Sequence, residues 1–237
     1  MADFFAEYFL VKLYFNAEFF DKVLHIIYNQ NMEKIEVIKS KFLMNMFDQN
    51  TYVILNKKEA IIVDAGAELV DVLKLTENKK VLAVLMTHLH FDHIWNLDKY
   101  LEQFSCPVYI VSGHEKKFEN GELNCSNIVR INLTKNIKKE QIKYYENNLK
   151  IGSFNIDVFF TPGHSADSVC LLIGDTLFSG DTVFADGIGR TDLYDSSNNQ
   201  MADSLEKIKT INYKNLCSGH YENSTKEKTD KLINYYL

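Results

Sequence analysis

The sequence predicts an α+β protein in which two mixed β-sheets pack face to face and helices cover both outer faces. Apolar runs of strand length recur in both halves of the chain, and segments with helical spacing lie between and after them. Of the 237 residues, 46% are hydrophobic, which is enough for one large core. No linker, low-complexity stretch or repeat interrupts the chain, so residues 32–237 are expected to form one domain.

The individual elements follow from the local spacing of apolar residues. Strand-like runs lie near residues 35–39, 42–47, 51–56, 60–64, 81–86, 108–111, 127–132, 141–145, 154–160, 168–174, 176–179 and 214–217. Helical spacing occurs near residues 67–77, 93–101, 200–210 and 225–235. The helix over 93–101 is expected to carry Asp92 and His93 at its start.

Residues 1–31 are predicted to be an N-terminal extension that forms a peripheral helix or stays disordered. They are rich in Phe, Tyr and Leu, but charged residues interrupt every apolar run. A membrane-spanning helix needs about 18 or more apolar residues, and a signal peptide needs a basic start and a small-residue cleavage site. Since neither pattern occurs, we expect a cytoplasmic protein with no membrane partner.

Charge and cysteine usage narrow the class of protein further. The net charge is −6, so there is no basic surface of the kind that nucleic acid attracts, and no nucleic-acid partner is expected. The four cysteines are widely spaced and form no Cys-x-x-Cys motif. We therefore expect free thiols, as is usual in a reducing compartment.

A dense cluster of histidines and acids follows the predicted strand at 81–86. Burying so many polar groups together is costly unless something neutralises them, and imidazoles and carboxylates are ligands suited to Zn²⁺, Fe or Mn²⁺. Three further donors follow other predicted strands through small-residue turns. The set predicts a metal centre built on loops at strand ends. Its members are His88, His90, Asp92, His93, His164, Asp181 and His220.

In combination these motifs resemble the metallo-β-lactamase superfamily. The likeness covers roughly residues 34–237 and implies that family's four-layer αββα sandwich. The stretch that runs from Gly180-Asp181-Thr182-Val183-Phe184 to Gly189-Arg190-Thr191-Asp192-Leu193 looks most like the glyoxalase II (hydroxyacylglutathione hydrolase)-like branch. Because only 17 residues follow His220, the single-domain form of that branch is expected.

The resemblance also implies two adjacent metal ions, with Zn²⁺ as the expected metal and Fe or Mn as alternatives. One ion would be held by His88, His90 and His164 and the other by Asp92, His93 and His220, with Asp181 bridging the two. Asp64 is expected to brace the ligand loop, although it could simply form a turn at a strand end. Arg190 could grip a substrate carboxylate or instead pair with Asp192.

The implied activity is hydrolysis of a small thioester such as S-lactoylglutathione by a hydroxide that bridges the metals, with Asp92 orienting it. A thioester is favoured because its thiolate leaves without much help from a general acid. One alternative is a mononuclear iron persulfide dioxygenase, in which His88, His164 and Asp181 would bind the iron. A true β-lactamase has less support, because those enzymes usually have Cys or Ser where Asp181 stands. The oligomeric state is left open.

Overall fold

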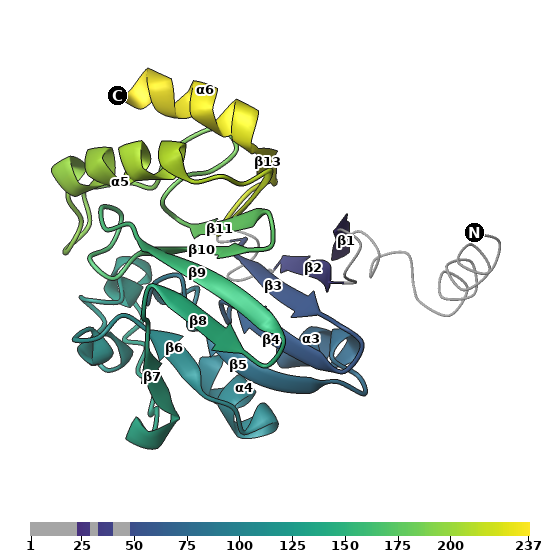
Figure 1. Ribbon diagram of the computed structural model, residues 1–237. Coiled ribbons are helices and arrows are strands. Elements are labelled where there is room, and N and C mark those ends of the chain that lie inside the picture. Colours follow the sequence, from purple (N-terminus) through teal and green to yellow (C-terminus); the bar gives the residue numbers. More distant parts are fainter. Residues whose placement is uncertain (1–22, 29–32, 40–47) are drawn as a thin grey trace.

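The computed structural model describes residues 23–28, 33–39 and 48–237, and within them two β-sheets face each other (Figure 1). The first sheet has seven strands in the order of the sequence. Its first four strands are antiparallel neighbours and its last four are parallel neighbours, so the sheet is mixed. The strands are β1 (Val23–Tyr28), β2 (Glu33–Lys39), β3 (Asn50–Leu55), β4 (Glu59–Val63), β5 (Lys80–Leu85), β6 (Val108–Ile110) and β7 (Ile142–Tyr144).

The second sheet has six strands in the order β13-β12-β11-β10-β9-β8 and is also mixed. Only the pair β11 and β12 is parallel, while the other neighbours run antiparallel. The strands are β8 (Asn148–Ile151), β9 (Phe154–Phe160), β10 (Val169–Ile173), β11 (Thr176–Gly180), β12 (Asn215–Ser218) and β13 (Ser224–Thr225). The sequence did not predict β8, which extends the antiparallel ladder beyond β9.

Alternating side chains of the strands divide the core into layers, as expected for strands that are buried on both faces. In β3, Tyr52 and Ile54 point toward the second sheet, whereas Val53 and Leu55 point toward the helices outside. The inner layer is completed from the other sheet by residues such as Phe154 and Phe178. Each sheet therefore contributes one face to the centre and one to a helical layer.

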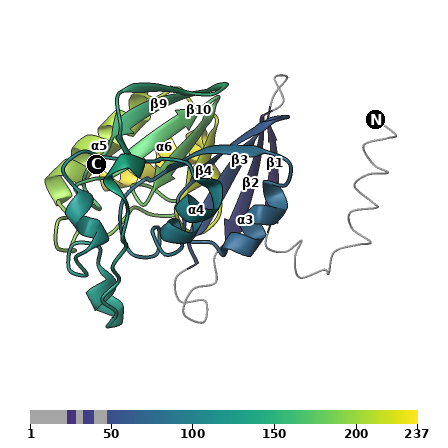
Figure 2. The same ribbon diagram turned by 90° about the horizontal axis from the view of Figure 1, so that it is seen from below.

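Helices complete the four layers. The helices α3 (Leu69–Leu75) and α4 (Leu97–Phe104) cover the first sheet, and α5 (Asn198–Thr210) and α6 (Lys226–Tyr236) cover the second. Figure 1 shows α5 and α6 above the sheets and α4 below them, and in the view from below α3 and α4 lie in front of the sheets (Figure 2). The predicted fold class, an α+β sandwich of two mixed sheets, is confirmed.

The predicted helix over 93–101 begins four residues later than expected. The carbonyl of His93 accepts a hydrogen bond from Ala65 N at 2.8 Å, and Asn96 N donates to Ala65 O at 2.8 Å. The Asn96 side chain also donates to the carbonyls of Gly66 and Ala67. These long-range bonds use the backbone groups that a helix would need, so Asp92 and His93 lie in a loop before α4.

The predicted strand near 127–132 is wrong. Residues Ser126–Val129 form a short 3₁₀ helix, η2, and Cys125 and Arg130 on either side of it have left-handed backbones, with φ values of 63° and 58°. Side chains of nearby residues accept hydrogen bonds from the backbone N–H groups that would otherwise pair with a neighbouring strand. Ser126 N donates to Asn124 Oδ1 at 3.0 Å, and Leu133 N donates to Ser126 Oγ at 3.0 Å.

The prediction that residues 1–31 form a peripheral helix or stay disordered is wrong for six of them. Val23–Tyr28 form strand β1, paired antiparallel with β2, where a peripheral helix or disorder was expected. Strand pairing along the sheet edge overrides the loosely helical spacing of this segment. The rest of the proposed extension and the predicted strand at 42–47 lie outside the described residues. Among the helices that the structure describes, none is long and apolar enough to cross a membrane.

Candidate metal centre

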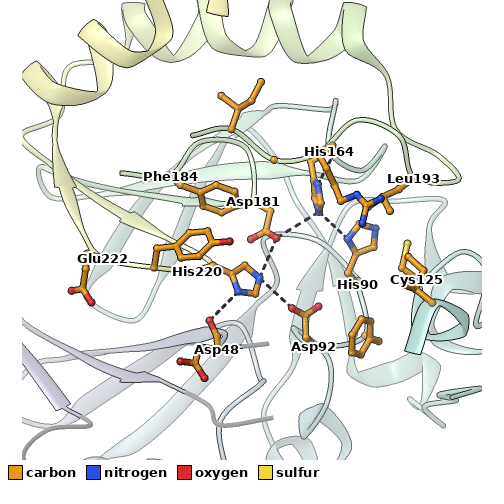
Figure 3. Close-up of a pocket in the computed structure, with 16 residues that line it drawn as sticks. Asp48, His90, Asp92, Cys125, His164, Asp181, Phe184, Leu193, His220 and Glu222 are labelled. Atoms are coloured by element: carbon orange, nitrogen blue, oxygen red, sulfur yellow. Dashed lines mark hydrogen bonds and ion pairs between the residues drawn. The ribbon is translucent and has the colours of Figure 1, made fainter. Parts of the chain in front are cut away.

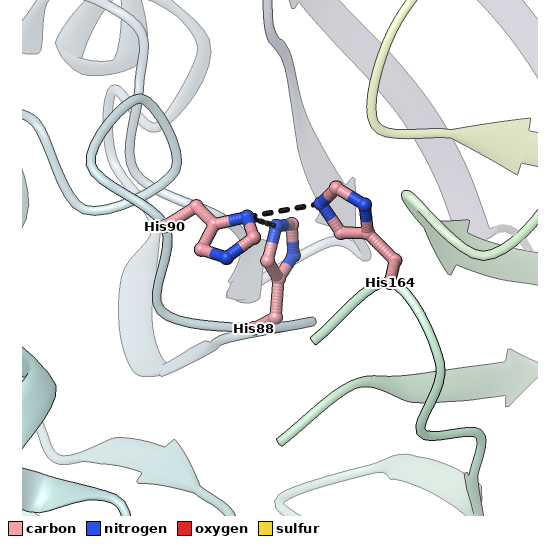
Figure 4. A group of neighbouring side chains, drawn as sticks. All are labelled: His88, His90 and His164. Carbon is pink, nitrogen blue, oxygen red and sulfur yellow. Dashed lines mark hydrogen bonds between the residues drawn. The ribbon is translucent and has the colours of Figure 1, made fainter. Parts of the chain in front are cut away.

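Three histidines from two separate loops bring their ring nitrogens to one point (Figure 4). His88 Nε2 lies 3.1 Å from His90 Nδ1, and His164 Nε2 lies 2.9 Å from the same atom. His88 and His90 lie in the loop after β5, and His164 lies in the turn between β9 and β10. All three side chains are buried. Such a triad of converging nitrogens is a suitable cradle for one metal ion.

A second group of donors lies beside the first (Figure 3). His220 Nε2 lies 3.1 Å from Asp92 Oδ2, and His93 Nε2 is 3.9 Å from that same oxygen. Asp181 lies between the two groups, with Oδ2 3.2 Å from His220 Nε2 and 3.6 Å from His164 Nε2. Its other oxygen, Oδ1, is 3.3 Å from His93 Nε2. The structure therefore brings together all seven donors that the sequence singled out.

The outward-facing nitrogens of these histidines are held by the surrounding chain. His93 Nδ1 contacts Asp64 Oδ2 at 2.8 Å, His164 Nδ1 contacts Arg190 O at 3.0 Å, and His220 Nδ1 contacts Asp48 O at 2.9 Å. Carboxylate and carbonyl oxygens accept hydrogen bonds, so each Nδ1 carries the proton and each Nε2 is left to bind a metal. The backbone oxygens of Asp48 and Arg190 could not be predicted from the sequence, because any residue type supplies them.

The protonation of the cluster differs between its two halves. Burial, together with the neighbouring imidazoles, holds the pKa of His88 and of His90 well below the ordinary value, so these rings are neutral. Burial opposes protonation of His93 as well, yet the carboxylates of Asp64, Asp181 and Asp92 raise the pKa of His93 to about 10. Without a bound metal, His93 is therefore protonated at neutral pH, and its charge offsets that of the neighbouring carboxylates.

The buried atoms of this cluster fit a metal ion. His93 Nε2 and Asp181 Oδ1 face each other without a hydrogen-bond partner, although buried polar atoms are normally paired. A cation bound there would satisfy the nitrogen lone pair and the carboxylate together and would replace protons on the histidines. The cluster is thus able to hold two metal ions.

Asp64 occupies the bracing position that the sequence predicted. Its backbone is left-handed, with φ 62°, at the end of β4. One carboxylate oxygen accepts from Thr87 N and the other accepts from both Thr87 Oγ1 and His93 Nδ1, each at 2.8 Å. The carboxylate thus ties the start of the donor loop to one of its donors. The left-handed backbone of Asp64 also changes the chain direction at the end of β4, which agrees with the alternative interpretation of this residue.

Replacing Asp64 by asparagine is expected to weaken metal binding by about 10- to 100-fold, which is typical for loss of a partner that orients a ligand. Asparagine tolerates the left-handed backbone, but its amide leaves one acceptor where the carboxylate offered two. Chelator competition would measure the affinity. Thr87→Val removes one bond to the same carboxylate and leaves His93 supported, so it should have a smaller effect. Equal affinities in Asp64→Asn and the native protein would contradict the bracing role.

Arg190 lies at the rim of the site, and its guanidinium forms a two-point ion pair with Asp192 at 2.7 and 2.8 Å. This is the second of the two roles that the sequence allowed. The pair is exposed on both sides, with Arg190 58% and Asp192 69% exposed, so it contributes little to stability. A contact between Arg190 and a substrate stays a prediction.

An open cavity of about 610 Å³ lies above the donors, and its floor includes His90, Asp92, His164, Asp181 and His220. That volume suits a small molecule. The walls are mainly apolar and contain Phe91, Cys125, Ile128, Phe184, Ile188, Leu193 and Tyr221. Three charged residues, Asp48, Arg190 and Glu222, also line it. The five donors on its floor are therefore reachable from solvent through this cavity.

Comparison with known proteins identifies the family. The model of the metallo-β-lactamase superfamily matches residues 44–220. A probable metallo-hydrolase of Bacillus subtilis, YqgX, is 35% identical over 178 residues, which are 72% of this chain and 84% of that protein. The crystal structure of BLEG-1, a B3 metallo-β-lactamase, is 32% identical with a TM-score of 0.77 and covers 86% of this chain and 99% of that one.

A more distant solved structure, ETHE1 from Myxococcus xanthus, has a TM-score of 0.56 at 18% identity and covers 90% of this chain and 89% of that one. At that identity the likeness concerns the fold alone. The family model, in contrast, matches residues 44–220, which include the donor loop and each later donor, and the Bacillus subtilis relative is similar over 72% of the chain. The chain therefore belongs to the metallo-β-lactamase superfamily, as a metallo-hydrolase with a cluster able to bind two metal ions.

Proposed function

We propose that this metallo-hydrolase cleaves a thioester, as members of the glyoxalase II-like branch do, with S-lactoylglutathione as its reference substrate. The observation that supports this most is the convergence of seven donors, five of which lie on the floor of an open cavity. The donor set favours Zn²⁺, although Fe or Mn would also fit imidazole and carboxylate ligands.

The donors divide into two sites. His88, His90 and His164 would hold one ion, Asp92, His93 and His220 the other, and Asp181 would contact both. When bound, two such cations activate a water molecule and polarise a carbonyl group. We assign the orientation of the attacking water to Asp92. Its side chain lines the cavity, and its Oδ2 lies 3.1 Å from His220 Nε2.

The leaving group is the reason for favouring a thioester over an amide. Expulsion of an amine requires a proton, whereas a thiolate leaves as an anion because thiols are far more acidic. No lysine lines the described part of the cavity, and its histidines are the candidate ligands His90, His164 and His220. The buried Cys125 thiol is a poor acid, since burial raises its pKa to about 11.

The charges at the cavity wall favour an uncharged thiol. Asp48 and Glu222 are acidic, and Arg190, the cation among the described lining residues, is already paired with Asp192. Glutathione carries two carboxylates and one ammonium group, so its net charge is negative and the acidic side chains of the cavity wall would disfavour it. We therefore expect kcat/KM for S-lactoyl-N-acetylcysteamine to exceed that for S-lactoylglutathione by several-fold to about tenfold.

Steady-state kinetics with the two thioesters tests this expectation. Asp48→Asn removes one of the two acids while the Asp48 carbonyl still accepts from His220, so the preference should shrink in that variant. A native protein that prefers the glutathione thioester would contradict the charge argument and would leave thioester hydrolysis itself supported.

Elemental analysis of the purified protein, paired with thioester turnover, tests the proposed function as a whole. About two metal ions per chain and turnover that chelator removes are expected. Likeness to a B3 metallo-β-lactamase makes lactam hydrolysis the second candidate, because water attacks a carbonyl in both reactions. Turnover of a chromogenic cephalosporin without turnover of either thioester would favour it. One iron per chain with oxygen uptake on glutathione persulfide would favour the dioxygenase alternative instead.

A further inference from the structure

A buried lysine lies beside the metal cluster and has no part in the chemistry proposed above. Lys117, in the 3₁₀ helix η1 (Glu115–Phe118), is only 2% exposed. Its Nζ donates to Ser165 Oγ at 2.5 Å and to Asp167 Oδ1 at 2.7 Å, and it pairs with Asp195 Oδ2 at 2.6 Å. All three donors of the ammonium group are used. A charge buried this deeply persists only when it is fully paired.

The partners of Lys117 lie on the loops that carry the first three metal donors. Asp167 follows His164 by three residues, and its second oxygen, Oδ2, accepts from Leu89 N at 2.9 Å. Leu89 stands between His88 and His90, so one carboxylate connects the turn of His164 with the donor loop. This carboxylate is 1% exposed and is not available to solvent.

Asp195 connects a third loop to the same ammonium group. Asp195 lies five residues after Arg190 in the same loop. The Arg190 carbonyl accepts a hydrogen bond from His164 Nδ1 at 3.0 Å. Ala166 N also donates to Asp195 Oδ2 at 3.4 Å, which joins this segment to the turn after His164. Lys117 therefore contacts, through two acids, every loop that positions His88, His90 and His164.

We propose that Lys117 is a positioning residue for the first metal site, which holds the His164 turn and the donor loop in register through Asp167 and Asp195. Without the ammonium, the buried carboxylate of Asp167 and the half-buried carboxylate of Asp195 would face each other across a few ångströms and repel. Asp167 would then be drawn away from Leu89 N, and the spacing between His88, His90 and His164 would change. This inference rests on the proposed ligand triad and not on the thioester substrate.

Lys117 also accounts for a second acidic group in the structure. The ligand atoms of His114, Asp167 and Asp195 lie within 4.8 Å of one another, a spacing at which a metal ion could be held. The Lys117 ammonium already lies 2.7 and 2.6 Å from the two carboxylates, so the chain itself supplies the cation there.

The test compares Lys117→Met with Lys135→Met. Lys135 is a similarly buried lysine, 6% exposed, that donates to Trp95 O at 2.5 Å and to Asp98 Oδ1 at 2.7 Å. Titration of the metal-free proteins with Co²⁺ against a competing chelator gives the affinity of each site, and the visible spectrum of bound Co²⁺ reports ligand geometry. In Lys117→Met we expect about 10- to 100-fold weaker binding at one site and an altered spectrum. Lys135→Met should lose comparable stability yet keep both affinities and the spectrum.

A second variant keeps the test valid if Lys117→Met does not fold. Lys117→Gln keeps a polar side chain that can still donate a hydrogen bond but removes the ammonium, so the Asp167 and Asp195 carboxylates would repel each other and the same loss of affinity is expected. Native Co²⁺ affinities and spectrum in whichever Lys117 variant folds would overturn the positioning role. An equal loss in Lys135→Met would overturn it too, because the effect would then be one of general stability. Failure of the native protein to hydrolyse thioesters would instead count against the proposed function alone.

Discussion

Replacing Asp181 by asparagine is expected to reduce thioester turnover by about 10³-fold or more and to lower the bound metal from about two ions per chain to about one. The Asp181 carboxylate lies between the two groups of donors, 3.2 Å from His220 Nε2, 3.6 Å from His164 Nε2 and, through its other oxygen, 3.3 Å from His93 Nε2. Asparagine is nearly isosteric but uncharged and keeps only one acceptor oxygen. It can therefore no longer contact both ions.

Elemental analysis and steady-state kinetics would measure these two effects. Asp192→Asn is a matched control, because it makes the same chemical change in an exposed carboxylate farther along the same loop. Circular dichroism should show that both variants keep the native secondary structure. Full turnover together with two metal ions in Asp181→Asn would refute the bridging role and with it the division of the donors into two sites.

A methyl group at Gly219 is expected to disable the site without removing any donor. A Cβ there would stand 2.2 Å from Asp181 Oδ1 and 2.8 Å from His93 Cε1. The backbone cannot easily retreat, because Gly219 N donates to Gly180 O at 2.8 Å and Gly219 O accepts from Asn50 N at 2.7 Å. The Asp181 and His93 side chains must therefore move. We expect Gly219→Ala to lose about 10²-fold in kcat, the scale of loss that a displacement near 1 Å can cause.

Gly187→Ala provides the control for this prediction. It lies in the loop between Asp181 and Arg190, but a Cβ there meets nothing closer than Tyr236 Oη at 3.8 Å. Metal content and turnover should be close to native in Gly187→Ala and reduced in Gly219→Ala. If both alanine variants behaved alike, the close contact at Gly219 could not be what shapes the donor cluster.

Local sequence was sufficient for the elements whose own side chains form the core. The strand predicted at 154–160 coincides with β9, whose alternate residues Phe154, Ile156 and Val158 face the other sheet. Local sequence failed where distant backbone groups compete for hydrogen bonds. The helix predicted from His93 begins only at Leu97, since the carbonyl of His93 accepts from Ala65 N instead.

The residue types of the donors, and their places at the ends of strands, were predictable from the amino-acid sequence. Histidines and acids that follow apolar runs through glycine turns indicate a metal-binding loop at any such strand end, because burial of these groups requires a neutralising partner. The two-layer sheet core was also predictable, because the spacing of apolar residues marks the strands.

The contacts that support these residues form between distant parts of the chain and could be found only in the folded protein. Lys117 comes 47 residues before His164 in the chain, and nothing in its neighbourhood marks it as part of a site. Its role follows from the packing of η1 against the turn 163–168, which buries the ammonium against Asp167. The same holds for the carbonyls of Asp48 and Arg190 and for the small space beside Gly219. Contacts of this kind depend on chain segments that meet only on folding, so no local pattern can encode them.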